Sequence, residues 1–546
     1  MMNRLGSPHR NPVQALNLPS PVQVSPTRPR WLALCGLLTL TSWVMSSGFP
    51  AWGQRTLPPL NVPAAPPSTP RTAPIPTFTA PPGNFSPVTC DATALPLAPT
   101  RSPDPAATAA LDQIPAPAAA LALPKVPAEV AITTSTPLTL EQSIELARRR
   151  NRDLQIAALQ IDQQREALRE VRASIYPALD VQGGITRTDS AQAAIAAKQA
   201  GLPNRPNASN NFNSSLNLNY DVFTSGQRPA SIRAAEAALR STEQAYQTQF
   251  QQLRLDVAND YYDLQQAGEL IRIARQSVAS AEENLRVTRA REAAGIGTRF
   301  EVLQAEVSLA DLRQQQTQAA SQQKIAQRQI AQRLSLPDTT TVTAADPVAM
   351  AGEWSPALEN SIVSALQNRS ELAQVLEQRQ ISQQNRRVAL GSLGPQVGFN
   401  ANITLADALD DDPLGAYGYG LGAQVNKTIF DGGSAKAIAA QQQTNTAIAE
   451  TQFASFKNVI RFQIEQNYAL LQSSRERILT TRCAIEQARQ GLRLAELRRD
   501  NGVGTSLEVS NATTDLAQAE NNYLQAIVDY NRSLASLQRF VGARQP

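Results

Sequence analysis

The chain has 546 residues, with 50 Lys and Arg against 46 Asp and Glu and a single histidine. Residues 1–53 contain that histidine, four arginines and no acidic residue, so the rest of the chain has 46 basic and 46 acidic residues. The charge therefore gives no support to nucleic-acid binding. The absence of histidine after residue 53 excludes Ser-His-Asp and Cys-His catalysis and His-containing zinc sites, and three scattered cysteines are too few for a thiolate cage. We expect no enzyme, no cofactor and no metal site.

Residues 1–53 are predicted to be a signal peptide. An apolar run at 31–49 follows the four arginines and precedes Ala51-Trp52-Gly53, which is the order of a basic, an apolar and a small-residue segment in exported proteins. An uncleaved membrane anchor is the alternative, since the run approaches the roughly 18–20 residues that span a bilayer.

Residues 54–137 are predicted to be a disordered linker. They contain 20 of the 37 prolines. Because proline fixes φ and has no amide donor, we expect an extended spacer without a helix or a sheet ladder.

The rest of the chain contains two copies of one pattern, at 138–337 and 356–541, joined by a connector at 338–355. Residues of the first copy recur 207 positions later. The recurring residues of the first copy are Phe223, Gly226, Tyr261, Leu264, Ile271, Val278, Leu285, Gly295, Gly297, Thr298, Val302 and Leu309. Upstream the offset is 217 or 218, which places a longer loop in the first copy. Each copy is predicted to contain helix, strand, strand, very long helix, glycine turn and helix, in that order.

The first helix is expected to begin after Thr139, because Thr139 and Gln142 have the spacing of a capping box. It is expected to continue to about Tyr176 and to end at Pro177, since the residue before a proline disfavours helix.

Four strands are predicted, at about 178–187, 214–223, 396–405 and 417–427. Their apolar residues alternate with polar ones over about nine to eleven residues, as in strands that cross a membrane at a tilt. A soluble sheet with one solvated face gives the same alternation, but two hairpins between very long helices favour an outer-membrane barrel. Four strands cannot close a barrel and lipid does not tolerate unpaired edges, so other copies of the chain must complete it.

The two long helices are predicted at about 227–294 and 434–501. At about 1.5 Å per residue each is roughly 100 Å long. In the first, apolar and small residues at 3-4 spacing indicate a coiled-coil seam, with a stutter near Tyr261. The seam positions are Phe250, Leu253, Val257, Tyr261, Leu264, Ala267, Ile271, Ala274, Val278, Ala281 and Leu285. The second helix repeats the pattern at Leu471, Ile478, Ile485 and Leu492.

Each long helix ends in a similar turn, Ala294–Thr298 and Asn501–Thr505. The first glycine suits the left-handed residue that closes a helix, and the threonine can cap the next helix. Capping does not account for the second glycine or its apolar neighbour, so we expect these tips to receive a partner helical hairpin. The predicted docking residues are Gly295, Gly297, Thr298, Gly502, Gly504 and Thr505.

Over roughly residues 139–542, the two copies, the strand hairpins, the paired turns and the Phe430-Asp431-Gly432-Gly433 sequence resemble the TolC-like outer-membrane efflux proteins. Thr428 stands where this family commonly has proline. The resemblance implies a homotrimer with a 12-stranded β-barrel in outer-membrane lipid and an α-helical tunnel in the periplasm. It also implies passive export of small molecules or proteins, through a periplasmic adaptor and an inner-membrane ABC, RND or MFS transporter.

The resemblance also implies a gate near the tips. Glu301, Glu508 and Arg299 are candidate gate residues, whereas Gln304 and Asn511 stand where the family often has an acid. A solvated carboxylate near a helix N-terminus is the competing interpretation of both glutamates. A periplasmic coiled-coil adaptor or a cell-wall scaffold is the alternative function, although an adaptor would have only one helical hairpin.

Overall fold

The computed structural model describes residues 95–98, 121, 123–201, 208–409 and 415–542. All of them fall within the second of the chain's two units, residues 85–546. The predicted signal peptide and most of the predicted linker lie outside the described residues.

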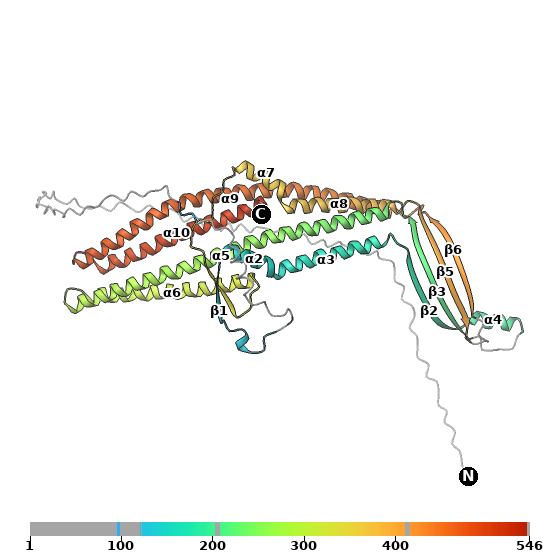
Figure 1. Cartoon of the computed structure of the whole chain (residues 1–546), viewed down its shortest axis with the longest axis horizontal. Helices are drawn as coiled ribbons and strands as arrows, with labels where there is room; N and C mark the ends of the chain where they lie inside the picture. The colour runs from blue at the N-terminus through green and yellow to red at the C-terminus, as the bar shows by residue number, and fades with distance from the viewer. Residues whose placement is uncertain (1–94, 99–120, 122, 202–207, 410–414, 543–546) are drawn as a thin grey trace, which may run out of the picture. The chain divides into compact units, whose positions relative to one another are not determined.

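The described chain is predominantly helical, and its two halves contain the same order of long elements (Figure 1). The first half consists of α2 (Leu140–Arg150), α3 (Arg152–Ala173), β2 (Ala178–Asp189), α4 (Ala191–Gln199), β3 (Ala208–Phe223), α5 (Gln227–Ala293) and α6 (Arg299–Arg333). The second consists of α7 (Leu358–Asn368), α8 (Ser370–Gly391), β5 (Gln396–Ala408), β6 (Ala416–Asn426), α9 (Ser434–Asp500) and α10 (Ser506–Val541). The longer loop of the first half contains α4.

The single first helix expected up to Tyr176 is wrong, because the chain forms two helices that meet at Asn151. The backbone of Asn151 is extended, and its side chain accepts a hydrogen bond from the amide of Leu154, which caps α3. The side-chain amide nitrogen of Asn151 also donates to the backbone carbonyl of Arg333, at the end of α6, so the break is held by a tertiary contact. The capping box of Thr139 and Gln142 is confirmed at the start of α2.

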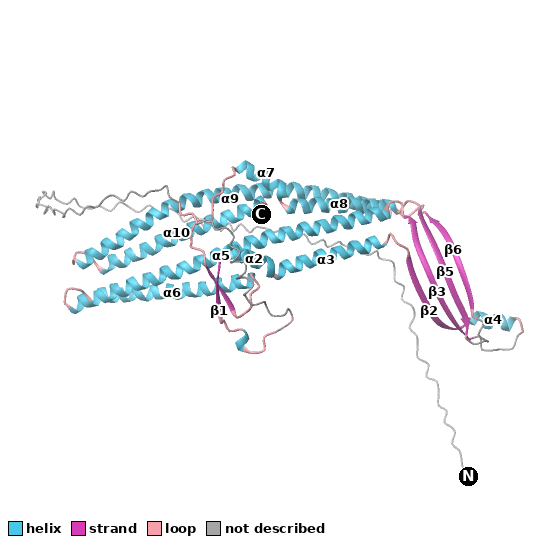
Figure 2. Cartoon of the chain, in the orientation of Figure 1, coloured by secondary structure: helices cyan, strands magenta, loops and turns pink. Residues whose placement is uncertain are grey.

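Four strands form one antiparallel sheet in the order β2-β3-β5-β6 (Figure 2, magenta). β2 and β3 extend beyond their predicted ranges, to Asp189 and back to Ala208, and β5 extends to Ala408. The register places the helix-connected ends of all four strands at the same edge of the sheet. Within the described chain, β2 and β6 are edge strands.

The long helices α5 and α9 have 67 residues each. α5 packs against α6, α8, α10 and α3, and α9 packs against α10 and α8. The predicted seam of α5 is buried except at Phe250 and Ala274, which are half-buried. In α9, Leu471, Ile478 and Ile485 are buried and Leu492 is partly buried. The apolar spacing therefore identified the face of each helix that packs inside the bundle.

A small parallel sheet forms between β1 (Thr134–Leu138) and β4 (Thr340–Ala344). The expectation that residues 54–137 contain no sheet ladder is therefore wrong at their C-terminal end, where β-branched residues precede Pro137. Upstream, the carbonyl of Pro96 accepts a hydrogen bond from the amide of Met350, at 2.9 Å. Proline lacks a donor but keeps its acceptor, so a proline-rich segment can still pair through its carbonyls.

The sheet of β1 and β4 is fastened to α5 by one polar cluster. The hydroxyl of Tyr261 has two acceptors for its one hydrogen, the carbonyl of Leu138 at 3.0 Å and the carboxylate of Asp346 at 2.8 Å. The same carboxylate accepts the first amide of α2, from Leu140. Tyr261 is fully buried. Among the described helices, none is sufficiently long and apolar to cross a bilayer.

Candidate docking and gate site

The two long helices end in turns of the same geometry. Gly295 and Gly502 both have φ of +75°. In the first turn, the amides of Ile296 and Gly297 donate to the carbonyl of Arg291, each at 3.0 Å. Such bonds satisfy the carbonyls that a helix end leaves free. The left-handed glycine is therefore required by the chain reversal itself.

The second hairpin repeats these contacts. The amides of Val503 and Gly504 donate to the carbonyl of Arg498, at 3.0 and 2.9 Å. Thr298 and Thr505 cap the following helices, as predicted, by accepting the amides of Glu301 and Glu508. The two threonines thus cap their helices in the same way.

The second glycine of each turn has a local explanation that the sequence did not reveal. A Cβ on Gly297 would lie 3.0 Å from the backbone nitrogen of Glu292, and one on Gly504 would lie 2.8 Å from that of Arg499. Each glycine therefore rests directly against the last turn of its own helix. Neither glycine needs a partner protein to account for its presence.

The tips nevertheless present bare apolar side chains. Ile296 is 70% exposed and Val503 is 71% exposed, at equivalent positions of the two turns. Phe300 and Leu507, at the start of the returning helices, are exposed as well. Four such side chains on two adjacent turns form an apolar surface, which we call the tip surface.

The candidate gate residues each bind within their own hairpin. The Glu301 carboxylate accepts the amide of Thr298, completing a capping box on α6. Arg299 lies 3.7 Å from Glu292, and Glu508 lies 3.3 Å from Arg498. In the described structure none of these three side chains forms an ion pair between the two hairpins.

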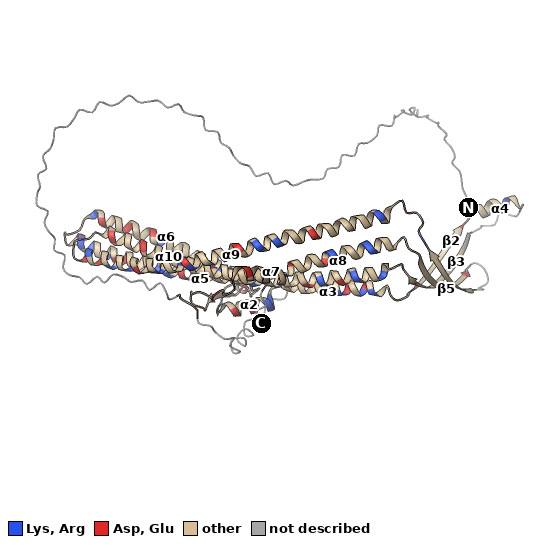
Figure 3. Ribbon diagram, turned by 90° about the horizontal axis from the view of Figure 1, so that it is seen from above, with Lys and Arg blue, Asp and Glu red and all other residues tan. Residues whose placement is uncertain are grey.

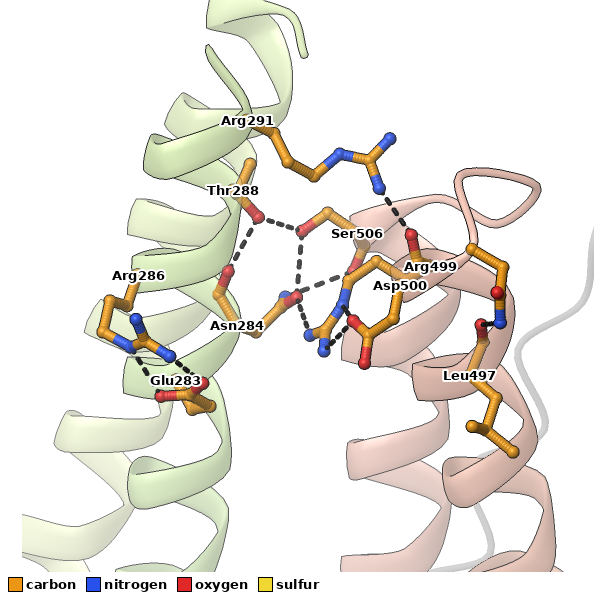
Figure 4. Close-up of polar contacts among 10 residues, drawn as sticks. Glu283, Asn284, Arg286, Thr288, Arg291, Leu497, Arg499, Asp500 and Ser506 are labelled. Carbon is orange, nitrogen blue, oxygen red and sulfur yellow. Dashed lines mark hydrogen bonds and ion pairs between the residues drawn. The ribbon is translucent and has the colours of Figure 1, made fainter. Parts of the chain in front are cut away.

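A buried polar cluster instead joins the hairpins close to their turns (Figure 4). Asn284 of α5 donates to the carbonyl of Ser506 at 3.3 Å and accepts from the Ser506 hydroxyl at 3.2 Å. The guanidinium of Arg499 donates to the Asn284 carbonyl oxygen at 3.2 Å. The hydroxyls of Thr288 and Ser506 lie 2.8 Å apart. We call these four residues the hairpin latch.

The latch is almost fully shielded from solvent. Arg499 is only 6% exposed, and its charge is balanced by Asp500, which accepts from it at 2.7 and 2.9 Å. Arg291 adds a bond from its guanidinium to the carbonyl of Arg499, at 2.6 Å. Buried polar groups that are fully hydrogen-bonded hold one arrangement and resist separation.

Sequence reasoning missed Asn284, Thr288 and Ser506. The first two stand on the same face of α5 as Ala281 and Leu285, so they interrupt the seam with polar groups where apolar ones are expected. That interruption was a readable signal, because a buried polar residue in a coiled-coil seam must find a partner.

In the described part of the chain there is no group of three or more His, Cys, Asp and Glu side chains that could hold a metal. Figure 3 shows Lys and Arg interspersed with Asp and Glu along the helices, most densely toward the turns. Several of these charges pair across one hairpin, such as Arg289 with Glu306 and Arg313 with Glu282, both at 2.7 Å.

Comparison with known families gives the decisive observation. Residues 143–335 and 361–543 match the family model described as outer membrane efflux protein. The chain belongs to the outer membrane efflux protein family. This confirms the TolC-like resemblance and the predicted outer-membrane location. The family consists of the outer-membrane channels of tripartite efflux systems, which work with adaptor and inner-membrane pump partners.

Two relatives show how far sequences diverge within the efflux family. The outer membrane efflux protein BepC of Brucella suis is 24% identical over 313 residues, covering 57% of this chain and 68% of BepC. The probable efflux pump outer membrane protein TtgC of Pseudomonas putida is 23% identical over 388 residues, covering 70% of this chain and 78% of TtgC.

The fold agrees with a solved efflux channel. The CmeC outer membrane channel of Campylobacter jejuni superposes with a TM-score of 0.64 at 17% sequence identity, covering 79% of this chain and 94% of CmeC. At this sequence identity the structural similarity shows a shared fold and nothing more.

Proposed function

We propose that three copies of this chain form a passive export channel, with a 12-stranded barrel in the outer membrane and a tunnel of helices in the periplasm. The single observation that carries this proposal is the four-stranded sheet of the efflux family fold. It exposes its apolar residues on one face, among them Val181, Tyr419 and Leu421, and it ends in two unpaired edges. Lipid on that face and a neighbouring copy at each edge would satisfy both features.

We infer that the tip surface is where a periplasmic adaptor binds. Its four exposed apolar side chains lie on two turns that the hairpin latch holds side by side, so a partner hairpin would meet a preformed surface. The predicted docking residues keep a supporting role, because Gly295, Gly297, Gly502 and Gly504 make turns small enough to expose Ile296 and Val503.

We infer that the gate acts through the hairpin latch rather than through Glu301, Glu508 and Arg299. Opening the tunnel at the tips requires one hairpin to move relative to the other. The latch is a buried polar contact between the hairpins close to their turns, whereas the side chains of Glu301, Glu508 and Arg299 each bind within a single hairpin. The energy for export would come from the inner-membrane pump.

Small organic molecules are the substrate class that we propose. Relatives from Pseudomonas putida are named for toluene, antibiotic and pyoverdine export. These compounds differ so much in chemistry that a wide tunnel is the simplest common requirement.

Cross-linking of the two sheet edges tests the proposal. Gln182→Cys on β2 is combined in turn with Gly418→Cys, Gly420→Cys and Gly422→Cys on β6, in a chain whose natural cysteines are replaced by serine. We expect at least one pair to give covalent dimers and trimers on oxidation in the membrane.

Gln182→Cys with Asn400→Cys is the matched control, because β5 is an inner strand and should give no covalent oligomer. If no β2–β6 pair cross-links between chains, or if the purified protein is a monomer that needs no detergent, the channel proposal is wrong.

A further inference from the structure

The four-stranded sheet has one face whose charge is unusually one-sided. The register places on it the even-numbered residues of β2, β5 and β6 and the odd-numbered residues of β3. Among the described strands, the ionisable residues of this polar face are Asp180 and Asp221, both acidic. Arg187, Asp189 and Asp407 belong to the opposite face. Figure 3 shows how few charged residues the strands contain.

Among the described residues, no cation forms an ion pair with either carboxylate. Asp180 accepts from the side-chain amides of Asn217 at 3.0 Å, Gln182 at 3.4 Å and Asn219 at 3.5 Å, all of which are neutral donors. Asp221 is exposed, and its carboxylate oxygen lies 3.6 Å from where a Cβ on Gly398 would be.

The cation nearest in sequence to Asp221 is directed elsewhere. Arg228 lies over the ring of Tyr220, which belongs to the opposite face, at 5.9 Å from its centroid. Its guanidinium also donates to the backbone carbonyl of Asp221, not to the carboxylate. The negative charge of Asp221 is therefore left to solvent.

The remaining side chains of the polar face add oxygen atoms but no positive charge. The amide oxygens of Asn402 and Asn400 lie 2.5 and 2.7 Å from where Cβ atoms on Gly420 and Gly422 would be. Both amide oxygens therefore lie close to the glycine backbone of β6. Carboxylate and carbonyl oxygens attract cations and repel anions.

We propose that Asp180 and Asp221 make the barrel of this channel, at the end where its strands join the helices, selective for cationic over anionic solutes. This inference rests on the proposed closed barrel, in which the polar face lines the pore and three copies contribute six carboxylates. A low-dielectric protein wall around a narrow aqueous path concentrates their field, and the selectivity should fall as salt screens it.

The test uses a thiol reporter inside the barrel, which is independent of any gate at the periplasmic tips. Ser215→Cys lies opposite Gln182 on the polar face and is nearly isosteric. In a background without the natural cysteines, it is modified from outside by a cationic and by an anionic methanethiosulfonate of similar size. Each rate is divided by the rate with a free thiol in solution.

We expect the cationic reagent to be favoured roughly 5- to 10-fold at about 10 mM salt and to lose that advantage near 1 M, where the screening length falls from about 30 to about 3 Å. Asp180→Asn with Asp221→Asn should bring the ratio close to one. Asp189→Asn, which removes an acid from the opposite face of β2, should leave it unchanged.

A ratio near one in the parent, or an unchanged ratio in the double variant, would overturn the selectivity while leaving the channel intact. A reporter thiol that neither reagent reaches in the membrane, but that both modify after unfolding, would instead contradict the barrel and the inference with it.

Discussion

Asn284→Ala is expected to loosen the contact between the two helical hairpins near their turns. The asparagine side chain makes three hydrogen bonds to the second hairpin, at 3.2 to 3.3 Å, one of them to the cationic Arg499. A neutral bond contributes about 0.5–1.5 kcal/mol and one to a charged group about 1.5–3. Because all three are long, the low end of each range applies, and their loss amounts to about 2.5 kcal/mol.

This energy sets the size of the functional effect. About 2.5 kcal/mol changes an equilibrium roughly 70-fold, so in each subunit the ratio of separated to latched hairpins should rise by about that factor. The open fraction of the channel should rise with it. Arg499 keeps Asp500 as its partner, so the substitution does not leave a buried charge unpaired. Single-channel recording in planar bilayers gives the open fraction directly.

The neighbouring residue provides the control. Glu283 pairs with Arg286 on its own helix, at 2.6 Å (Figure 4), and both are exposed. Glu283→Ala should therefore leave the open fraction unchanged. The double variant Glu301→Ala with Glu508→Ala should also change it little, since both side chains bind within their own hairpins. An unchanged open fraction in Asn284→Ala, or a large increase in the glutamate double variant, would refute the latch as the gate.

Three further outcomes follow from the structure. Gly504→Ala should destabilise the second turn by about 1–3 kcal/mol, because the added methyl group would overlap the preceding helix. Gly491→Ala, in open space within α9, should instead stabilise the helix by about 0.5–1 kcal/mol, and thermal unfolding distinguishes the two. Ile296→Asp with Val503→Asp should abolish adaptor cross-linking at the tips without changing the oligomeric mass; retained cross-linking would remove the tip surface from docking. Burial raises the pKa of Glu371, but hydrogen bonds and charges from two buried arginines outweigh it and lower the pKa to about 2. Because this folded pKa lies below the unfolded one, the stabilisation is present above about pH 4.5 and lost as pH falls toward 2; Glu371→Gln should flatten acid unfolding over that range, and an unaltered acid curve would contradict this assignment.

The long helices were predictable because their seams repeat over many turns. α5 and α9 begin at the expected residues and end one residue before the predicted ends. The outer parts of β2 and β3 were not predictable, because residues such as Arg187 and Asn210 make both faces polar there and remove the alternation.

The break at Asn151 had a signal that was overlooked. Asn151-Arg152 matches Asn368-Arg369 in the second copy, and both pairs lie where one helix ends and the next begins. Asparagine alone does not end a helix. The tertiary bond from Asn151 to the carbonyl of Arg333, which no local pattern contains, helps to hold the interruption.

The sequence predicted where the docking and gate site lies, at the two helical tips, but not which residues join the hairpins there. The paired turns identified the tips, and their caps formed as expected at Thr298 and Thr505. The latch depends on which faces of α5 and α10 meet, and that depends on packing between segments more than 200 residues apart. Sequence spacing within one helix cannot supply that information.

The most direct test of the export channel is to measure subunit number and conductance on the same sample. Protein extracted from outer membranes in detergent should have the mass of three chains, and the same preparation should form ion-conducting pores in planar bilayers without any added nucleotide. A monomer, or a trimer that never conducts even with Asn284→Ala, would contradict the account.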